Sequence, residues 1–434
     1  MRFKSQLKHI TLKSHILESP FSGLPVIITF LIAIKSAASY LLARLNRVEA
    51  LKNKANPPEA VTAVMDIQTY EKSVAYTVAK SNFESLTDIV DALIVIIALF
   101  SGLLPFIYLK VMSYGSLNSA WLGALFLIVT SLFLSVFSIP FELYNQFKIE
   151  AEFGFNKSTF KLWVSDKMKG FFLSLIIGLP LLAGLLSLVN RVGSTWWIWG
   201  FILIFIFQLI MLVLYPVLIM PLFNKLSPLP DGLLKDRLFS LGERTGFKAK
   251  SIQVMDGSKR SGHSNAFFTG FGRFRRIVLF DTLIAQLTEE ELEAVLAHEI
   301  GHYRLGHIPK GLALSFLGTA LSFAVIAWLC TTSWFNPAFG FTQGHLAPSF
   351  LLVGLVGGLV TFWISPLFNL LSRKHEYEAD RFAKDAMGNA DAMIAALRKL
   401  STKNLSNLTP HPWYSSFHYS HPTLVEREAS LKSS

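Results

Sequence analysis

Long apolar stretches separated by polar segments are the main pattern of the chain, and seven of them are about as long as a transmembrane helix. A helix needs about 20 predominantly apolar residues to cross a hydrocarbon core about 30 Å thick. The seven stretches lie near residues 24–44, 89–110, 119–140, 171–190, 196–220, 311–332 and 348–371. The pattern therefore predicts an all-α polytopic membrane protein with seven transmembrane helices.

One polar connection is long enough to fold by itself, residues 221–310 between the fifth and sixth stretches. Its periodicity alternates between that of a helix and that of a strand, which is typical of an α+β domain. We expect a helix at 233–244 and strands at 251–255, 265–269 and 276–280, the last two paired through Gly270 and Gly272. A small α+β domain is therefore predicted between helices 5 and 6.

The next helix of this domain has a clear beginning. Thr288 is followed three positions later by Glu291, and this spacing is that of a capping box. Leu292, Val295 and Leu296 then recur with the helical period. We predict a helix that continues through residues 298–302.

These elements divide the chain into four parts. We expect residues 1–220 to form the N-terminal membrane region with spans 1 to 5, and residues 221–310 to form the α+β domain. Residues 311–371 would hold spans 6 and 7, and residues 372–434 would form a C-terminal region.

Composition and charge agree with a membrane protein. Hydrophobic residues make up 52% of the chain and charged residues only 16%, which argues against several soluble domains. The excess of 40 Lys and Arg over 29 Asp and Glu is explained by basic cytoplasmic loops, so no nucleic-acid partner is expected. The long basic connections follow spans 1, 3 and 5, which predicts that the α+β domain and the C-terminal region are cytoplasmic. Cys330 is the single cysteine, so a disulfide or a thiolate metal site is excluded.

Candidate chemistry lies on the capped helix, in the segment His298-Glu299-Ile300-Gly301-His302. Two imidazoles four residues apart share one helix face and can hold one zinc ion. Glu299 lies about 100° around the helix from His298, so its carboxylate can act as the general base without being a ligand. A surface helix with two histidines and a glutamate has the same pattern. A third ligand is therefore needed to distinguish a zinc site from such a helix.

A catalytic zinc ion needs a third protein ligand and one open position. One large class of zinc proteases uses a histidine six residues after the second one, but that position is Ile308 here. His307 is one residue out of register, and we interpret it as a polar residue at a helix end. Glu376 and Asp380, one helical turn apart, can divide two roles: one binds zinc and the other accepts the second N–H of a ligand histidine. The alternative is a charged juxtamembrane helix with i, i+4 ion pairs.

Topology favours the metal site. Spans 6 and 7 lie between His302 and Glu376, and two crossings return the chain to the membrane face that it left. We therefore predict one zinc ion per chain, held by His298, His302 and Glu376, with Asp380 as the outer partner.

The chain resembles the type I CAAX prenyl endopeptidase family, which consists of polytopic membrane zinc proteases. The resemblance covers most of the chain and includes several segments besides the two that carry the predicted ligands. They are 152–156 (Glu-Phe-Gly-Phe-Asn), 221–224 (Pro-Leu-Phe-Asn), 256–258, 265–270, 281–283, 419–422 and 426–427.

The resemblance implies seven helices around a large water-filled chamber, which the zinc site closes at the cytoplasmic side. It implies that Asn265, Ala266 and Phe267 hold the substrate backbone as an added strand. It further implies that His421 and Arg427 stabilise the developing oxyanion. Without the resemblance, Asn265 reads as a turn residue and the tail as a solvated basic helix end.

Together these observations predict a membrane-embedded zinc metalloendopeptidase, resembling the enzymes that remove the C-terminal tripeptide of prenylated CAAX proteins. Its partners would be a peptide or protein substrate, prenylated or membrane-bound, and the lipid bilayer. Its compact loops favour a bacterial inner (plasma) membrane.

Three alternatives stay open. A membrane-protein quality-control protease would share the site but not the prenyl specificity. A protease cutting within the bilayer would carry its histidine pair in an apolar span, whereas the segment 288–296 contains four glutamates. A non-enzymatic channel or lipid-binding protein with structural zinc would need a fourth ligand, which only His263, His307 or His421 could supply.

Overall fold

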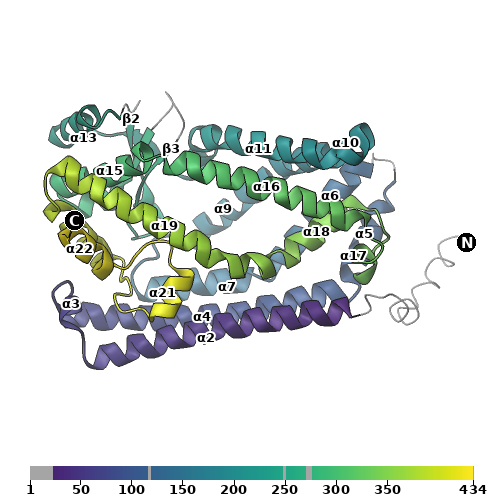
Figure 1. The fold of residues 1–434 in the computed structure, drawn as a ribbon, viewed down its shortest axis with the longest axis horizontal. Helices are drawn as coiled ribbons and strands as arrows, with labels where there is room; N and C mark the ends of the chain where they lie inside the picture. Colours follow the sequence, from purple (N-terminus) through teal and green to yellow (C-terminus); the bar gives the residue numbers. More distant parts are fainter. Residues whose placement is uncertain (1–22, 116–118, 248–250, 270–275, 434) are drawn as a thin grey trace, which may run out of the picture.

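A computed structural model describes residues 23–115, 119–247, 251–269 and 276–433 of the chain. Long helices run lengthwise through an elongated molecule, and the small sheet and the C-terminus lie together at one end (Figure 1). The short helix α17 (Phe335–Ala338) lies at the opposite end (Figure 1). The chain is thus mostly helical with one small sheet, as the apolar pattern predicts.

The first two long helices, α2 (Leu24–Ala55) and α4 (Ile67–Phe100), lie side by side along one edge of the molecule (Figure 1). The short α3 (Glu59–Thr62) connects them, and the Asp66 side chain caps α4 by accepting a hydrogen bond from the Thr69 N–H at 2.9 Å. Buried Arg47 of α2 donates to Ser85 of α4 at 2.8 Å, which fixes the pairing of the two helices.

The chain then continues through further helical elements of the membrane region. These are α5 (Leu103–Met112), α6 (Ser119–Val136), α7 (Ile139–Tyr144), η1 (Asn145–Ile149), α8 (Glu150–Glu152), α9 (Phe160–Leu173), η2 (Ser174–Gly178), α10 (Leu179–Val192), η3 (Gly193–Thr195), α11 (Trp196–Leu214), η4 (Tyr215–Ile219) and α12 (Met220–Phe223). After the sheet domain come α16 (His307–Thr331), α18 (Leu346–Val356) and α19 (Gly358–Met387).

Several of these elements can cross a membrane. Four helical stretches of the described residues are long and apolar enough: Leu24–Ala55, Ser119–Val136, Phe160–Phe223 and His307–Thr331. Two helix pairs also qualify, although they are bent, α4 with α5 by 56° and α18 with α19 by 51°. Only 6% to 39% of the residues in the apolar windows of the four stretches are buried in protein, as expected for helices that face lipid. A polytopic membrane protein is confirmed.

All seven predicted spans fall on these elements. The 64-residue stretch Phe160–Phe223 contains both the fourth and the fifth. The chain reverses there at η3. This is shown by Gly200 of α11, which lies so close to α10 that a Cβ on it would be 2.8 Å from the Leu185 side chain. The number of crossings remains a prediction, whereas the apolar segments themselves are helical as expected.

The sheet has four strands in the order β1-β2-β4-β3. Their bounds are β1 (Leu226–Pro228), β2 (Ser251–Met255), β3 (Ala266–Thr269) and β4 (Arg276–Phe280). The pair β2 and β4 is parallel, while β1 with β2 and β3 with β4 are antiparallel. The sequence predicted β2, β3 and β4 and missed β1; the predicted turn at Gly270 and Gly272 lies outside the described residues. β3 is an edge strand.

Helices cover this sheet and form its core. They are α13 (Leu233–Arg244), α14 (Asp281–Gln286), α15 (Glu289–Arg304) and α20 (Asp391–Lys403), together with Ala383 of α19. The remaining helical elements of this part are η5 (Gly257–Lys259), α21 (Pro412–His418) and α22 (Leu424–Ser433). The capping box that begins α15 is formed, with Thr288 and Glu291 each accepting from the other's backbone N–H. Leu292, Leu296 and Ile300 are fully buried, so α15 is anchored by one apolar face.

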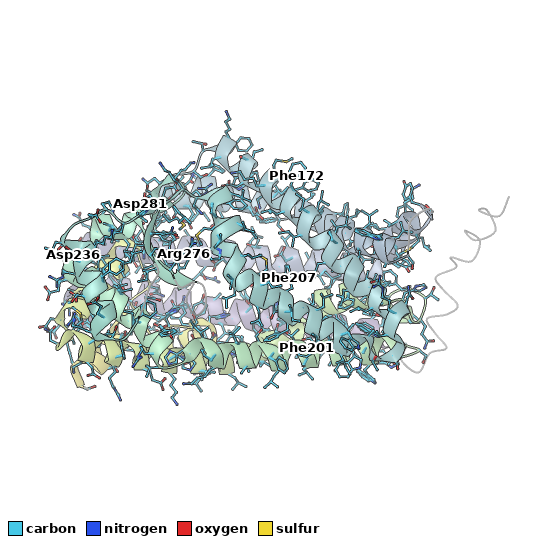
Figure 2. The ribbon with its side chains drawn as sticks, turned by 90° about the horizontal axis from the view of Figure 1, so that it is seen from above. Phe172, Phe201, Phe207, Asp236, Arg276 and Asp281 are labelled. Atoms are coloured by element: carbon cyan, nitrogen blue, oxygen red, sulfur yellow. The ribbon has the colours of Figure 1, made fainter. Side chains whose placement is uncertain are left out.

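The charged and aromatic side chains labelled in Figure 2 lie in different parts of the molecule. Figure 2 shows Asp236, Arg276 and Asp281 at the end that carries the sheet, and Phe172, Phe201 and Phe207 along the helices that extend away from it. This separation is consistent with a polar domain mounted on a membrane region.

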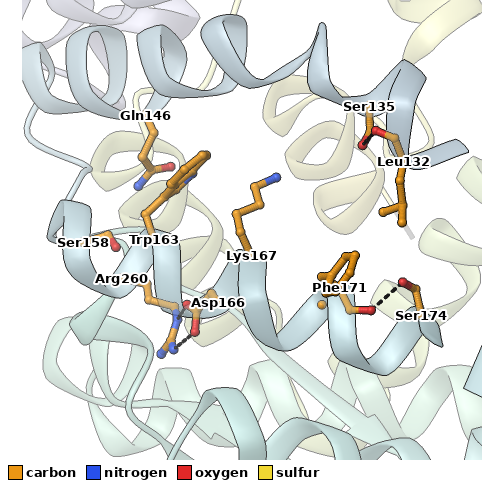
Figure 3. Close-up of a pocket in the computed structure, with 11 residues that line it drawn as sticks. Leu132, Ser135, Gln146, Ser158, Trp163, Asp166, Lys167, Phe171, Ser174 and Arg260 are labelled. Atoms are coloured by element: carbon orange, nitrogen blue, oxygen red, sulfur yellow. Dashed lines mark hydrogen bonds and ion pairs between the residues drawn. The ribbon is translucent and has the colours of Figure 1, made fainter. Parts of the chain in front are cut away.

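A salt bridge joins the sheet domain to the membrane helices beside a cavity of about 580 Å³. Arg260 donates to both carboxylate oxygens of Asp166 on α9, at 2.9 and 3.1 Å (Figure 3). Trp163, Lys167 and Phe171 of α9 line the same cavity (Figure 3). The charged pair fixes the domain against α9.

Candidate active site

The predicted histidine pair lies on α15 with both rings on one face. The Nε2 atoms of His298 and His302 are 3.1 Å apart, because residues four positions apart are neighbours along a helix. His298 is 6% exposed, and its position is fixed by the buried apolar face of the same helix. Two nitrogen lone pairs are thus directed at one point.

The helix α19 brings a carboxylate to that point. Glu376 Oε1 lies 3.3 Å from His302 Nε2, and Glu376 Oε2 lies 3.5 Å from His298 Nε2. The two helices can approach this closely because Gly301 of α15 faces Ala379 of α19 without a side chain of its own. The structure therefore brings together the three residues that the sequence predicted as ligands.

The geometry of this group fits zinc. Ligand atoms about 2.05 Å from an ion at tetrahedral angles lie about 3.3 Å apart. The two Nε2 atoms here are 3.1 Å apart, and each lies 3.3 or 3.5 Å from one of the two Glu376 carboxylate oxygens. One ligand atom of each residue lies within 4.8 Å of the other two. The Glu376 Oε2 atom is buried and makes no hydrogen bond to any described residue. A buried carboxylate oxygen without a hydrogen bond is costly unless a cation binds it directly, and the nearest guanidinium nitrogen, Nη1 of Arg427, is 3.6 Å away.

The charge around His298 also favours a cation. Its Nδ1 atom donates to Asp380 Oδ1 at 2.8 Å. Burial alone would lower the pKa of His298, but the hydrogen bond to Asp380 and the nearby Glu376 carboxylate outweigh burial and raise the pKa to about 9. The surroundings therefore stabilise positive charge at this position, and a divalent ion supplies it while leaving the imidazole neutral.

Asp380 lies where the sequence predicted, and it is held in turn by Arg427 of α22. Arg427 donates from Nε to Oδ2 at 2.8 Å and from Nη2 to Oδ1 at 2.5 Å. Both residues are buried, at 1% and 9% exposure. The remaining nitrogen, Nη1, lies 3.6 Å from Glu376 Oε2. Two of the three guanidinium nitrogens thus hold the outer carboxylate, a contact that the sequence did not predict.

Glu299 follows His298, the first predicted ligand, and is partly buried. Burial raises the pKa of its carboxyl group above the usual range. A carboxylate with a raised pKa is better suited to accept a proton near neutral pH and to release it again.

His421 reaches the group from the C-terminal segment. Its Nε2 atom lies 3.4 Å from Glu376 Oε1, while its side chain is 64% exposed. Arg373 of α19 holds the preceding turn by donating to the Tyr419 carbonyl at 2.6 Å. The imidazole is therefore near the predicted ligands and still accessible to a substrate.

The predicted substrate-binding residues lie at the edge of the sheet. Asn265 precedes β3, its carbonyl accepts from the Phe280 N–H at 3.1 Å, and its side chain accepts from the Ala266 N–H at 2.8 Å. Ala266 and Phe267 begin β3, which pairs with β4 on one side and also contacts α15. The segment is thus extended and lies beside the helix that carries the histidine pair.

His307 is more than the polar helix-end residue that the sequence suggested. It does begin α16, but it is only 7% exposed, and its Nδ1 atom lies 2.9 Å from His302 Nδ1. Its Nε2 atom lies 2.9 Å from Glu378 Oε2. The glycine before it, Gly306, was the available signal, because a glycine there lets the chain turn back toward the helix that it has just left.

The sequence matches two families that together cover most of the chain. Residues 47–225 match the family described as CAAX prenyl protease N-terminal, five membrane helices, and residues 228–434 match Peptidase family M48.

Proteins similar over nearly the full length give the same assignment. The CAAX prenyl protease 1 homolog of Oryza sativa subsp. japonica is 35% identical, with 94% of this chain and 97% of the relative covered. The chain belongs to the CAAX prenyl protease 1 family of M48 peptidases. CAAX prenyl protease 1 of Saccharomyces cerevisiae is also 35% identical, with 94% of each chain covered.

A solved structure has the same fold. The crystal structure of S. mikatae Ste24p matches with a TM-score of 0.87 and 34% sequence identity, covering 94% of this chain and 98% of that chain. The M48 assignment identifies a membrane zinc metallopeptidase and decides against the non-enzymatic alternative.

One expectation is not supported. The relatives are eukaryotic, from rice, yeast and Homo sapiens among others, so the predicted bacterial origin finds no support. Compact loops were the only argument for it.

Proposed function

We propose that this protein hydrolyses a peptide bond near the C-terminus of prenylated CAAX proteins. The observation that carries the proposal is the meeting of His298, His302 and Glu376 from two helices at the spacing of a zinc site. The substrate class comes from the names of relatives that match over nearly the whole chain.

The three residues would hold one zinc ion, with Asp380 fixing the tautomer and orientation of His298. When bound, the ion supplies Lewis-acid polarisation of the scissile carbonyl and lowers the pKa of water beside it. Three protein ligands leave one coordination position open for the reaction.

Glu299 is the proposed general base. It would take a proton from the attacking water and deliver it to the leaving amine, so that the carboxylate returns to its starting state. Its raised pKa, caused by burial, supports both halves of this role.

His421 and Arg427 are proposed to stabilise negative charge on the carbonyl oxygen. His421 supports this role through its exposure and its 3.4 Å distance from Glu376. For Arg427 only Nη1 is available, because Nε and Nη2 donate to Asp380. We therefore expect His421 to be the stronger donor to the substrate.

The substrate backbone is proposed to align along Asn265, Ala266 and Phe267. An edge strand offers main-chain donors and acceptors to an extended peptide, and β3 is an edge strand that contacts α15. Such pairing would place the scissile bond beside the histidine pair without requiring a particular side-chain sequence.

The topology belongs to the proposal as well. Seven crossings, with the sheet domain and residues 372–434 on the cytoplasmic side, are consistent with the helical stretches and with the long basic connections. This placement would present the site to the cytoplasmic tails of membrane-bound substrates.

Cleavage of a farnesylated CAAX peptide by the detergent-purified chain tests the proposal. An unlipidated peptide of the same sequence is the control, and each is incubated with and without a zinc chelator. Chelator-sensitive cleavage preferring the farnesylated peptide supports it, whereas equal rates on both peptides would favour the quality-control alternative. Cleavage that survives removal of the metal would contradict the zinc mechanism.

A further inference from the structure

The two predicted ligand histidines have different partners on their outer nitrogens. His298 donates to a carboxylate, Asp380, which lies on α19. His302 instead faces a third imidazole, with its Nδ1 atom 2.9 Å from Nδ1 of His307. His307 then reaches a carboxylate of its own, Glu378 on α19, at 2.9 Å.

The metal at one end of these contacts and the Glu378 carboxylate at the other together determine the tautomer of each ring. A metal at His302 Nε2 requires that nitrogen to offer its lone pair, so the proton of His302 is on Nδ1. His307 Nδ1 then accepts that proton's hydrogen bond, and the proton of His307 is on Nε2. Glu378 accepts from it, because an ionised carboxylate can only accept.

The local backbone brings the two rings together. In an uninterrupted helix, a residue five positions after His302 would lie about 140° around the axis from it. Instead α15 ends at its C-cap Leu305, and Gly306 has φ +70° before α16 begins at His307. A left-handed residue at a helix end turns the chain back on itself. This turn places His307 against the ring of His302.

The ring of His307 is also fixed in its plane. It is 7% exposed and stacks on His375, with centroids 3.9 Å apart and an interplanar angle of 10°. Rotation of the ring would break the stack and both of its hydrogen bonds. A fixed acceptor orients the donor that faces it.

We propose that His307, supported by Glu378, is a positioning residue that holds His302 in the tautomer and orientation needed to bind zinc. The inference rests on the zinc site proposed above. It gives one turn of α19 three functions: Glu376 as the ligand, Asp380 behind His298, and Glu378 behind the His302–His307 pair.

A second metal ion at His307, His375 and Glu378 is the competing interpretation, because their ligand atoms lie within 4.8 Å of one another. The stack argues against it. An ion about 2.1 Å from a nitrogen of each ring must lie near both ring planes, and planes that are nearly parallel and stacked do not meet there. Both nitrogens of His307 are also already engaged.

Zinc affinity of the full chain in detergent, measured by chelator competition, tests the proposal. The variant His307→Phe keeps a stacked ring but removes the acceptor, and we expect zinc to bind about 10- to 100-fold more weakly. The variant His307→Asn offers an amide oxygen near the position of Nδ1 and should restore most of the affinity. His375→Phe is the matched control, because it changes the same stack and should leave the affinity within about threefold of the starting protein.

The outcomes separate this inference from the proposed function. Equal zinc affinity of the starting protein and His307→Phe would overturn the positioning role. So would two zinc ions per chain, one of which is lost in both His307→Phe and His375→Phe. A starting protein that binds no zinc would instead contradict the proposed function itself. Thermal unfolding of the metal-free variants shows whether any loss reflects misfolding, and the Asn variant distinguishes a lost acceptor from lost packing.

Discussion

Gly301 on α15 packs directly against Ala379 on α19: a Cβ atom added to Gly301 would lie 3.1 Å from the Ala379 Cα and 3.2 Å from its carbonyl oxygen. Gly301 lies one position before the predicted ligand His302, and Ala379 lies three positions after the predicted ligand Glu376. The distance between the two backbones therefore sets the distance from the histidine pair to the carboxylate.

Gly301→Ala should weaken zinc binding although Gly301 is not a ligand. The added methyl group meets backbone atoms that cannot move aside, so α15 and α19 must separate by a few tenths of an ångström. We expect a destabilisation of about 1–3 kcal/mol and a lower zinc-to-protein ratio. Gly318→Ala on α16, where a Cβ would meet no atom within 4 Å, is the matched control. Unchanged metal content in Gly301→Ala would show that the contact does not set the geometry.

Glu299→Gln should abolish cleavage and retain zinc. The amide cannot accept the proton, and loss of a general base typically costs about 10²- to 10⁴-fold in rate. Metal content and turnover of the farnesylated peptide are measured on the same preparation. Turnover at the original rate would remove the base assignment.

Glu376→Ala should lose the metal rather than only the activity. The substitution leaves two imidazoles to hold the ion, and we expect the zinc-to-protein ratio after dialysis to fall well below one. Glu243→Ala, an exposed carboxylate on α13, controls for the general effect of removing a glutamate. Retention of one zinc ion by Glu376→Ala would require a different third ligand.

Arg427→Ala should destabilise the C-terminal half of the protein. It leaves the carboxylate of Asp380, which is 1% exposed, without its two strongest donors. Breaking a buried pair in this way costs about 3–5 kcal/mol. Adding Asp380→Asn to Arg427→Ala removes the uncompensated charge, so thermal unfolding of the double variant should be closer to that of the starting protein. A double variant less stable than Arg427→Ala would contradict this explanation.

Stability should fall in acid partly because of Glu150, which links α4 to the sheet domain. Burial alone would raise the pKa of Glu150, but hydrogen bonds from His263, Tyr76 and Lys80 outweigh it and lower the pKa to about 2. A group with a lowered pKa stabilises the folded state above its unfolded pKa of 4.5, and the contribution is lost as pH falls from there toward 2. It amounts to about 3 kcal/mol at most.

The pH dependence is measured as the unfolding temperature between about pH 6 and pH 3. Over this range the stabilising contribution of the Glu150 carboxylate is lost. Glu150→Gln should be less stable than the starting protein at pH 6, and the difference should shrink toward pH 3. A constant difference across this range would show that the charge of Glu150 does not contribute.

The sequence predicted those parts of the molecule that depend on local patterns. The helix Leu233–Arg244 and the strands Ser251–Met255 and Arg276–Phe280 appear with the predicted bounds. An amphipathic period marks the helix, and short apolar runs rich in β-branched residues mark the strands. The strand Leu226–Pro228 was missed, because three residues that end in proline are too few to show the alternation of apolar and polar positions that marks a strand. Apolar length likewise predicted where the membrane helices lie but not their bends.

Much of the candidate site was also predictable. Two predicted spans lie between His302 and Glu376, and an even number of crossings returns the chain to the same side of the membrane. What the sequence could not supply were contacts that depend on how chain segments meet. The oxyanion role expected of Arg427 stays a prediction, and its two hydrogen bonds to Asp380 were a contact that the sequence did not predict. His307 was out of register with a known ligand pattern, and only the turn at Gly306 brings it back to His302.

The ligands lie on two helices, α15 and α19, that are joined through the last membrane hairpin, so a bound ion closes this hairpin into a loop. Any force that separates the helices, such as a change in bilayer thickness or lateral pressure, must weaken metal affinity by the same free energy with which the ion resists separation. Metal retention then depends on the surrounding lipid. Exchange of zinc should be faster in thin or disordered bilayers than in bilayers whose thickness matches the apolar helices.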